Sequence, residues 1–141
     1  MRAIIVDPSA PAALRLGDVP EPAVGPGQLL LEVRHASLNH GDLNDARSGR
    51  VTPGGVLGSD SAGVVVQAAA DGTGPAAGTR VVALAPGAFA QRVAVEADAL
   101  AEVPPSVDLA KAAAFPVAGV AALRALGPAG AVGSTSTASS A

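Results

Sequence analysis

The chain has 141 residues, a formal net charge of −3, no cysteine and only 1% aromatic residues. This length suits one domain with a buried core, and the lack of cysteine excludes disulfides and thiolate chemistry. The nine basic and twelve acidic residues are scattered singly, which gives no footprint for nucleic acid or for an anionic membrane surface. The sequence has neither a signal-peptide core nor a run approaching the roughly 20 apolar residues of a membrane span. We therefore expect a cytoplasmic protein.

Short β-rich segments separated by Gly and Pro turns run through the first hundred residues. We predict strands at residues 2–6, 14–19, 28–38, 62–67, 80–84, 89–95 and 99–103. The alternation is clearest in the third strand, where Leu29, Leu31 and Val33 share one face, and the same period places His35 on that inward face. Short strands at this spacing predict a mainly β fold, either an antiparallel barrel or a sandwich.

Capping residues predict three short helical segments. Asp42 is a candidate N-cap for a helical turn over residues 43–48. Beyond a Pro-Pro pair, Ser106 is a candidate N-cap for a helix over residues 107–114. A proline starts the last helix, residues 116–126, which a Gly-Pro pair ends.

Three segments in order carry a family resemblance. They are Ala36-Ser37-Leu38-Asn39-His40-Gly41-Asp42-Leu43, Leu57-Gly58-Ser59-Asp60-Ser61-Ala62-Gly63-Val64-Val65 and Gly78-Thr79-Arg80-Val81-Val82-Ala83-Leu84. Followed by the 87–93 and 113–116 segments, they resemble the medium-chain dehydrogenase/reductase superfamily, in its zinc-free quinone oxidoreductase branch. The resemblance spans residues 1–126. It implies a GroES-like antiparallel β-barrel with short helices and two C-terminal helices, which would be the substrate-side catalytic domain.

The resemblance implies hydride transfer from NADPH to a small quinone, enone or carbonyl acceptor. Members of the family continue into a Rossmann domain that binds NADPH, and we expect this chain to be truncated before that domain and inactive alone. Gly127, Gly130 and Gly133 lack the Gly-x-Gly-x-x-Gly spacing of a nucleotide loop, so residues 127–141 are expected to form a disordered Ser/Thr/Ala tail. The helix before them should then expose an apolar stripe.

The zinc ligands of related enzymes have no counterparts here. Zinc-dependent relatives carry Cys where Asn39 stands and a His-Glu pair where Ser59 and Asp60 stand. Because Asn and Ser are poor zinc ligands, we expect no metal site. The alternative, a metal held through His40 and Asp60, leaves only two credible ligands.

The candidate catalytic residues are Asn39, His40 and Asp42. The resemblance implies that the Asn39 amide bonds a substrate carbonyl or the nicotinamide ribose, whereas a plain reading makes it a loop cap. His40 could donate a proton to the reduced substrate, or be a solvated loop histidine. Asp42 could brace the site, or serve only as a helix N-cap. The candidate cofactor contacts are Asn39 and Ala121, the latter where relatives often carry a Thr whose hydroxyl Ala121 cannot replace.

Asp60 is expected to support the fold by pairing with Arg47 or Arg80 at the barrel rim. The alternative function is a stand-alone GroES-like binding module that complements a separate nucleotide-binding subunit. The chain could also form a homodimer. A co-chaperonin role is disfavoured because the sequence lacks a long mobile loop with a hydrophobic tripeptide.

Overall fold

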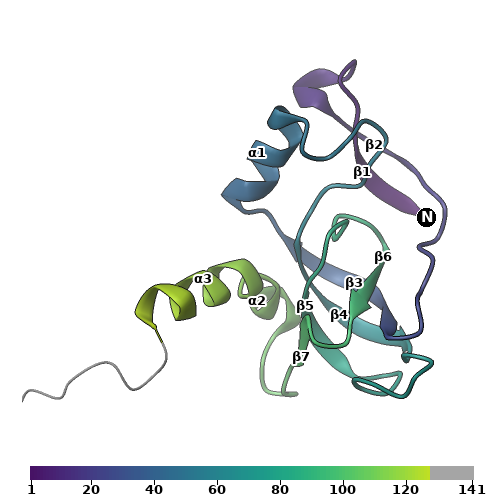
Figure 1. The fold of residues 1–141 in the computed structure, drawn as a ribbon, viewed down its shortest axis with the longest axis vertical. Coiled ribbons are helices and arrows are strands. Elements are labelled where there is room, and N and C mark those ends of the chain that lie inside the picture. The colour runs from purple at the N-terminus through teal and green to yellow at the C-terminus, as the bar shows by residue number, and fades with distance from the viewer. Residues whose placement is uncertain (128–141) are drawn as a thin grey trace, which may run out of the picture.

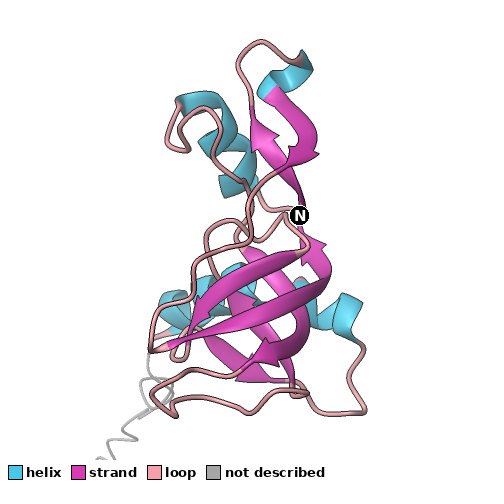
Figure 2. Ribbon diagram, turned by 90° about the vertical axis from the view of Figure 1, so that its right-hand side faces the viewer, coloured by secondary structure: helices cyan, strands magenta, loops and turns pink. Residues whose placement is uncertain are grey.

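The computed structural model describes residues 1–127. Its centre is a five-stranded antiparallel sheet in the order β6-β3-β4-β5-β7, which curls on itself (Figure 2). The strands are β3 (Gln28–Ser37), β4 (Asp60–Gln67), β5 (Arg80–Leu84), β6 (Arg92–Glu96) and β7 (Leu100–Glu102). The fold is mainly β and GroES-like, as expected.

A two-stranded antiparallel sheet lies at one end of this curled half-barrel, beside the first helix (Figure 1). Its strands are β1 (Arg2–Val6) and β2 (Leu14–Asp18), joined through a 3-10 turn, Pro11–Ala13. The helix is α1 (His40–Ser48), which Gly49 ends in a left-handed conformation with φ 73°. Val6, Ala46 and Leu57 form a small core between this sheet, α1 and the segment before β4.

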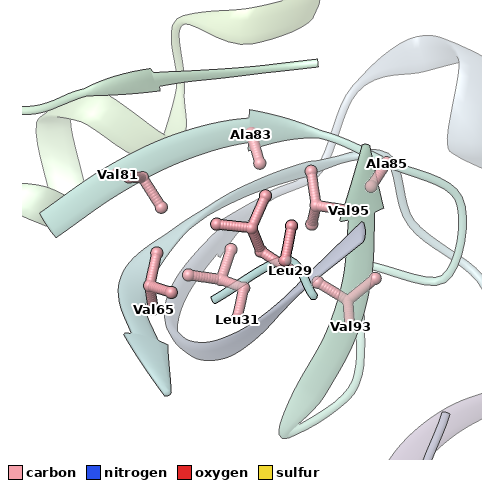
Figure 3. Close-up of a cluster of buried hydrophobic side chains, with 9 residues drawn as sticks. Leu29, Leu31, Val65, Val81, Ala83, Ala85, Val93 and Val95 are labelled. Atoms are coloured by element: carbon pink, nitrogen blue, oxygen red, sulfur yellow. The ribbon is translucent and has the colours of Figure 1, made fainter. Parts of the chain in front are cut away.

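The main core fills the inside of the curled sheet (Figure 3). Leu29 and Leu31 of β3 are 0% and 1% exposed and meet valines from the other strands, among them Val65, Val81 and Val95. Full burial of each such side chain contributes about 1.5–3 kcal/mol. Alternation in β3 therefore predicted the correct inward face for these two leucines.

His35 does not continue that face, and the expectation of an inward histidine is wrong. Its side chain is exposed. The pairing of β3 with β4 shifts register between Val33 and His35, as in a β-bulge. An extra residue on one strand resets the alternation beyond it.

The remaining helices pack against the outside of the sheet (Figure 1). They are α2 (Leu109–Ala113) and α3 (Pro116–Leu126). The N-cap of α2 is Asp108, whose carboxylate accepts from the backbone N–H groups of Ala110 and Lys111, so the expectation of Ser106 as the cap is wrong. A carboxylate at the positive end of the helix dipole is favourable.

The α3 helix buries none of its residues fully. Leu123 is 71% exposed, Leu126 is 72% exposed and Val120 is 36% exposed. The expected apolar stripe is thus present at Val120 and Leu123, while Val117 is half-buried. The expected disorder of the Ser/Thr/Ala tail concerns residues that, from position 128 onward, lie outside the described part of the chain. Among residues 1–127, the structure contains no helix with the length and hydropathy of a membrane span.

Candidate functional site

A partly buried polar network joins three segments that are distant in the sequence. It lies where β3 runs into α1, where β4 begins and where α3 begins. Its members are Asn39, Asp42, Ser59, Asp60 and the backbone N–H of Val117. Asp42 is 3% exposed and Asp60 is 2% exposed. The structure therefore brings two of the three predicted catalytic residues, Asn39 and Asp42, into one cluster.

Asn39 and Asp42 form a reciprocal capping box at the start of α1. Asn39 Oδ1 accepts from the Asp42 backbone N–H at 3.1 Å, and Asp42 Oδ2 accepts from the Asn39 backbone N–H at 2.9 Å. Asn39 is the N-cap and Asp42 the third helical residue, so the expectation of Asp42 as the cap is wrong. Two N–H groups with no helical partner are satisfied in this way.

The Asn39 amide nitrogen makes the links to β4. Nδ2 donates to Ser59 Oγ at 2.8 Å and to Asp60 Oδ2 at 3.0 Å. Ser59 Oγ in turn donates to Asp42 Oδ1 at 2.8 Å. Each buried carboxylate oxygen in the network thus has a donor, which offsets the cost of burying the charge.

Asp60 caps α3 from a distant part of the chain. Its Oδ1 accepts from the Val117 backbone N–H at 2.8 Å, across 57 residues. The local N-cap residue, Phe115, makes no side-chain cap bond, so the Asp60 carboxylate supplies the negative charge favoured at a helix N-terminus.

The predicted ion pair of Asp60 with Arg47 or Arg80 is wrong. Arg80 donates to the carbonyl oxygens of Pro104 and Val107 at 3.0 and 2.7 Å. Arg47 is exposed on α1. The Asp60 carboxylate is satisfied instead by an amide and a helix N–H.

The network fixes which way the Asn39 amide points. Carboxylates accept and do not donate, and the Asp42 backbone N–H only donates. The nitrogen must therefore face Asp60 and Ser59, and the oxygen must face the start of α1. Both amide hydrogens are used, and Oδ1 retains one lone pair for a further donor.

A cavity of about 230 Å³ lies next to the network. Asp42 and Ser59 line it together with Asp45. Its other walls are aliphatic or small, among them Val51, Leu57 and Leu84. Few polar groups in an apolar cavity are typical of small-molecule sites.

Asp45 adds a charge to this cavity. Its Oδ1 lies 3.2 Å from Arg50 Nη1, yet that oxygen has no hydrogen bond of acceptable geometry within the described residues. The short distance supports electrostatic attraction, and the poor alignment means that the contact adds little as a hydrogen bond.

His40 and Ala121 lie outside the network. His40 is the first residue of α1 and its imidazole is exposed. Ala121 is an exposed residue of α3, four residues after Val117 and so on the same helix face. Within residues 1–127, no group of three or more His, Cys, Asp or Glu side chains could hold a metal ion.

Sequence reasoning did not identify two partners in the network. The sequence points to Ser59 only as a residue that replaces a zinc ligand. The short Ser59-Asp60 pair following Gly58 was a usable signal, since both side chains reach Asn39. The Val117 N–H gives no sequence signal, because any residue other than proline carries the same group.

The comparisons with known proteins match the fold of this chain. The family model for the alcohol dehydrogenase GroES-like domain matches residues 25–105. A trans-enoyl reductase from Aspergillus flavipes is 34% identical over 138 residues, covering 87% of this chain and 39% of the relative. The quinone oxidoreductase of Coxiella burnetii superposes with a TM-score of 0.81 at 29% identity, over 89% of this chain and 44% of that chain.

A mycobacterial protein solved in complex with NADPH superposes with a TM-score of 0.79 at 32% identity, over 91% of this chain and 41% of that one. The chain spans less than half the length of each of these proteins. The matched family model covers most of the β-barrel, including Asn39, Asp42, Ser59 and Asp60. The chain belongs to the alcohol dehydrogenase GroES-like domain family, within the medium-chain dehydrogenase/reductase superfamily.

Proposed function

We propose that this chain is the substrate-side domain of a zinc-free, NADPH-dependent oxidoreductase that reduces a quinone, an enone or a related carbonyl compound. The observation that carries the proposal is the partly buried network around Asn39, which lies beside a cavity with mostly aliphatic walls. Similarity to a trans-enoyl reductase and to a protein complexed with NADPH supports the same reaction class.

The residues around Asn39 fit a dinucleotide cofactor. The free lone pair of Asn39 Oδ1 accepts a hydrogen bond, which suits a ribose hydroxyl or a carboxamide N–H. Gly41 keeps space beside that oxygen, since a Cβ there would lie 2.9 Å from Oδ1. Ala121 would touch the nicotinamide side of the cofactor through its methyl group only. NADPH, when bound, supplies the hydride.

The protein's part in this chemistry is to bind and orient. The capping box and Ser59 hold the Asn39 amide in one orientation, which lowers the entropy lost when a ligand binds. The aliphatic walls of the cavity exclude water from the acceptor. His40, next to Asn39 in the sequence, is the proposed proton donor to the reduced substrate, because imidazole commonly serves as a general acid.

The proposed reaction needs no zinc. The Asn39 nitrogen and the Ser59 hydroxyl, which stand where relatives carry zinc ligands, donate hydrogen bonds to carboxylates. Neither group has the thiolate or imidazole chemistry that zinc prefers. Treatment of this domain, once joined to a nucleotide-binding domain, with a chelator should therefore leave its turnover of the acceptor unchanged.

The proposal includes a second, nucleotide-binding domain, either on the same polypeptide or on another. The exposed apolar residues of α3 support this, because a surface of that kind usually has a partner. We therefore expect the 141-residue chain alone to bind NADPH weakly in isothermal titration and to show no quinone reduction.

A chimera tests the function directly. The chain would be joined after Leu126 to the nucleotide-binding half of the Aspergillus flavipes trans-enoyl reductase, and NADPH oxidation would be followed with enone and quinone acceptors. We expect turnover in the chimera, a loss of about tenfold or more in kcat/KM for Asn39→Ala, and no loss for Asp18→Asn, which changes an exposed carboxylate on β2. A chimera that binds NADPH and reduces no acceptor would contradict the proposal.

The alternative is a binding module that completes a separate nucleotide-binding subunit. The same exposed face of α3 favours it. Mixing the two halves as separate chains distinguishes the alternatives: restored turnover with co-elution supports assembly between subunits, whereas turnover only in the covalent chimera supports a single polypeptide.

A further inference from the structure

Each oxygen of the buried Asp60 carboxylate accepts one hydrogen bond from a different part of the chain. Oδ2 accepts from Asn39 Nδ2 at 3.0 Å and Oδ1 accepts from the Val117 backbone N–H at 2.8 Å. Asn39 belongs to the cap of α1 and Val117 to the first turn of α3. Asp60 is therefore the direct link between the candidate ligand-binding amide and the last described helix.

Together with the Asp42 backbone N–H, which donates to Oδ1, this link sets which atom of the Asn39 amide faces each neighbour. An asparagine side chain can present either its oxygen or its nitrogen to a neighbour. A buried carboxylate on one side permits only the nitrogen there, so the oxygen is turned toward the start of α1 and the space beside Gly41. Without Asp60, the amide would be held on that side by Ser59 alone.

We propose that Asp60 is a positioning residue that fixes Asn39 as a hydrogen-bond acceptor and couples its orientation to the N-terminus of α3. The ligand group that meets Asn39 is then a donor, such as a hydroxyl or an amide N–H, and not the carbonyl oxygen of an acceptor. This inference rests on the proposed function only for the identity of that ligand. The coupling itself is a property of the 141-residue chain.

An amide at position 60 breaks the link without changing the size of the side chain. The amide of Asp60→Asn has one accepting oxygen, so it cannot accept from both Asn39 and Val117, and its nitrogen opposes one of these donors. We expect exchange of the Val117 amide proton to become at least about tenfold faster, and the side-chain amide resonances of Asn39 to shift. The control Asp18→Asn should change neither signal.

A second variant changes Asn39, the donor to Asp60, instead of Asp60 itself. Asn39→Ser keeps a good N-cap for α1 and removes the amide hydrogens that reach Asp60. We expect the Asp42 amide to remain protected and the Val117 amide to exchange several-fold faster, although residue 39 does not bond to Val117. This variant decides the question even where Asp60→Asn does not fold.

Nuclear magnetic resonance on the labelled chain measures both signals without cofactor or turnover, so this test is separate from that of the proposed function. Faster exchange at Val117 in both variants supports the coupling. Unchanged exchange at Val117 in Asn39→Ser, with α1 intact, would overturn it. Unchanged Asn39 side-chain resonances in a folded Asp60→Asn variant would overturn the proposed control of the amide orientation.

Discussion

Gly58 sets the approach of the chain to Ser59 and Asp60. Its φ is +103°, and a Cβ at this position would clash with the Phe89 ring and lie 2.6 Å from the Phe89 backbone nitrogen. A positive φ strains residues with a side chain, and here the neighbouring backbone also blocks the space. The turn that places Ser59 and Asp60 at the start of β4 therefore depends on glycine.

Replacement of Gly58 by alanine tests this dependence. Gly58→Ala should lower the free energy of unfolding by about 2–4 kcal/mol, because conformational strain and overpacking add. Gly78→Ala is the matched control: its φ is +91°, and nothing lies within 4 Å of an added Cβ. It should cost only about 1–2 kcal/mol, the strain of a side chain at positive φ without overpacking. Denaturant titration measures both, and equal losses would contradict the role of the Phe89 contact.

Asn39 and Asp42 could be identified as candidate site residues from the sequence, but not which of them is the N-cap of α1. Both residues are good helix caps, and the Asn-x-x-Asp spacing fits either as the start of α1. In the structure Asn39 is the cap, because its backbone is extended and its side chain accepts from the Asp42 N–H, while its amide nitrogen also reaches Asp60 of β4. Long-range bonds of this kind cannot be predicted from local capping preferences.

At the level of elements, the predicted bounds of the short apolar strands agree closely with the structure. The predicted first and fifth strands coincide with β1 and β5, since each is a short apolar run between turns. The predicted strand at 89–95 begins only at Arg92, because Phe89 and Ala90 contact β1 from a turn. The bulge that exposes His35 has no local signal, because it depends on pairing with β4.

The start of α2 gives a prediction at this scale. Asp108→Ala removes an acceptor for two backbone N–H groups and should cost about 1 kcal/mol of stability. Ser106→Ala changes a residue that is exposed before the helix and should stay within about 0.5 kcal/mol of the parent. Thermal unfolding of the two variants separates them, and a larger loss for Ser106→Ala would mean that the helix starts earlier than in the structure.

For the molecule as a whole, the apolar core and the polar network occupy different places. The leucines and valines inside the curled sheet stabilise the barrel, while the network lies where α1, β4 and α3 meet. A core with so few aromatic residues was evident from composition. The composition gave no indication that Asp60 holds α3 to the curled sheet, because that bond joins residues 57 positions apart.

The exposed face of α3 gives the last prediction. Val120 and Leu123 line a groove of about 390 Å³ with Leu100 of β7, and Leu123 is 71% exposed. Leu123→Glu should reduce the binding of an apolar dye by the isolated chain and weaken its association with a nucleotide-binding half, because a charge in the groove opposes apolar contact. Its free energy of unfolding should change by no more than about 0.5 kcal/mol, since the side chain is mostly in solvent.

The matched control is Leu16→Glu, which places the same charge at a leucine of β2 that is 54% exposed. It should leave association with the nucleotide-binding half unchanged, because β2 lies away from α3 (Figure 1). Equal weakening by the two variants would show that α3 has no special part in the contact. A loss of more than 1 kcal/mol in Leu123→Glu, against the limit of about 0.5 expected for an exposed side chain, would show that Leu123 is packed in solution. Selective weakening by Leu123→Glu would instead identify α3 as the surface through which the barrel meets its cofactor-binding partner.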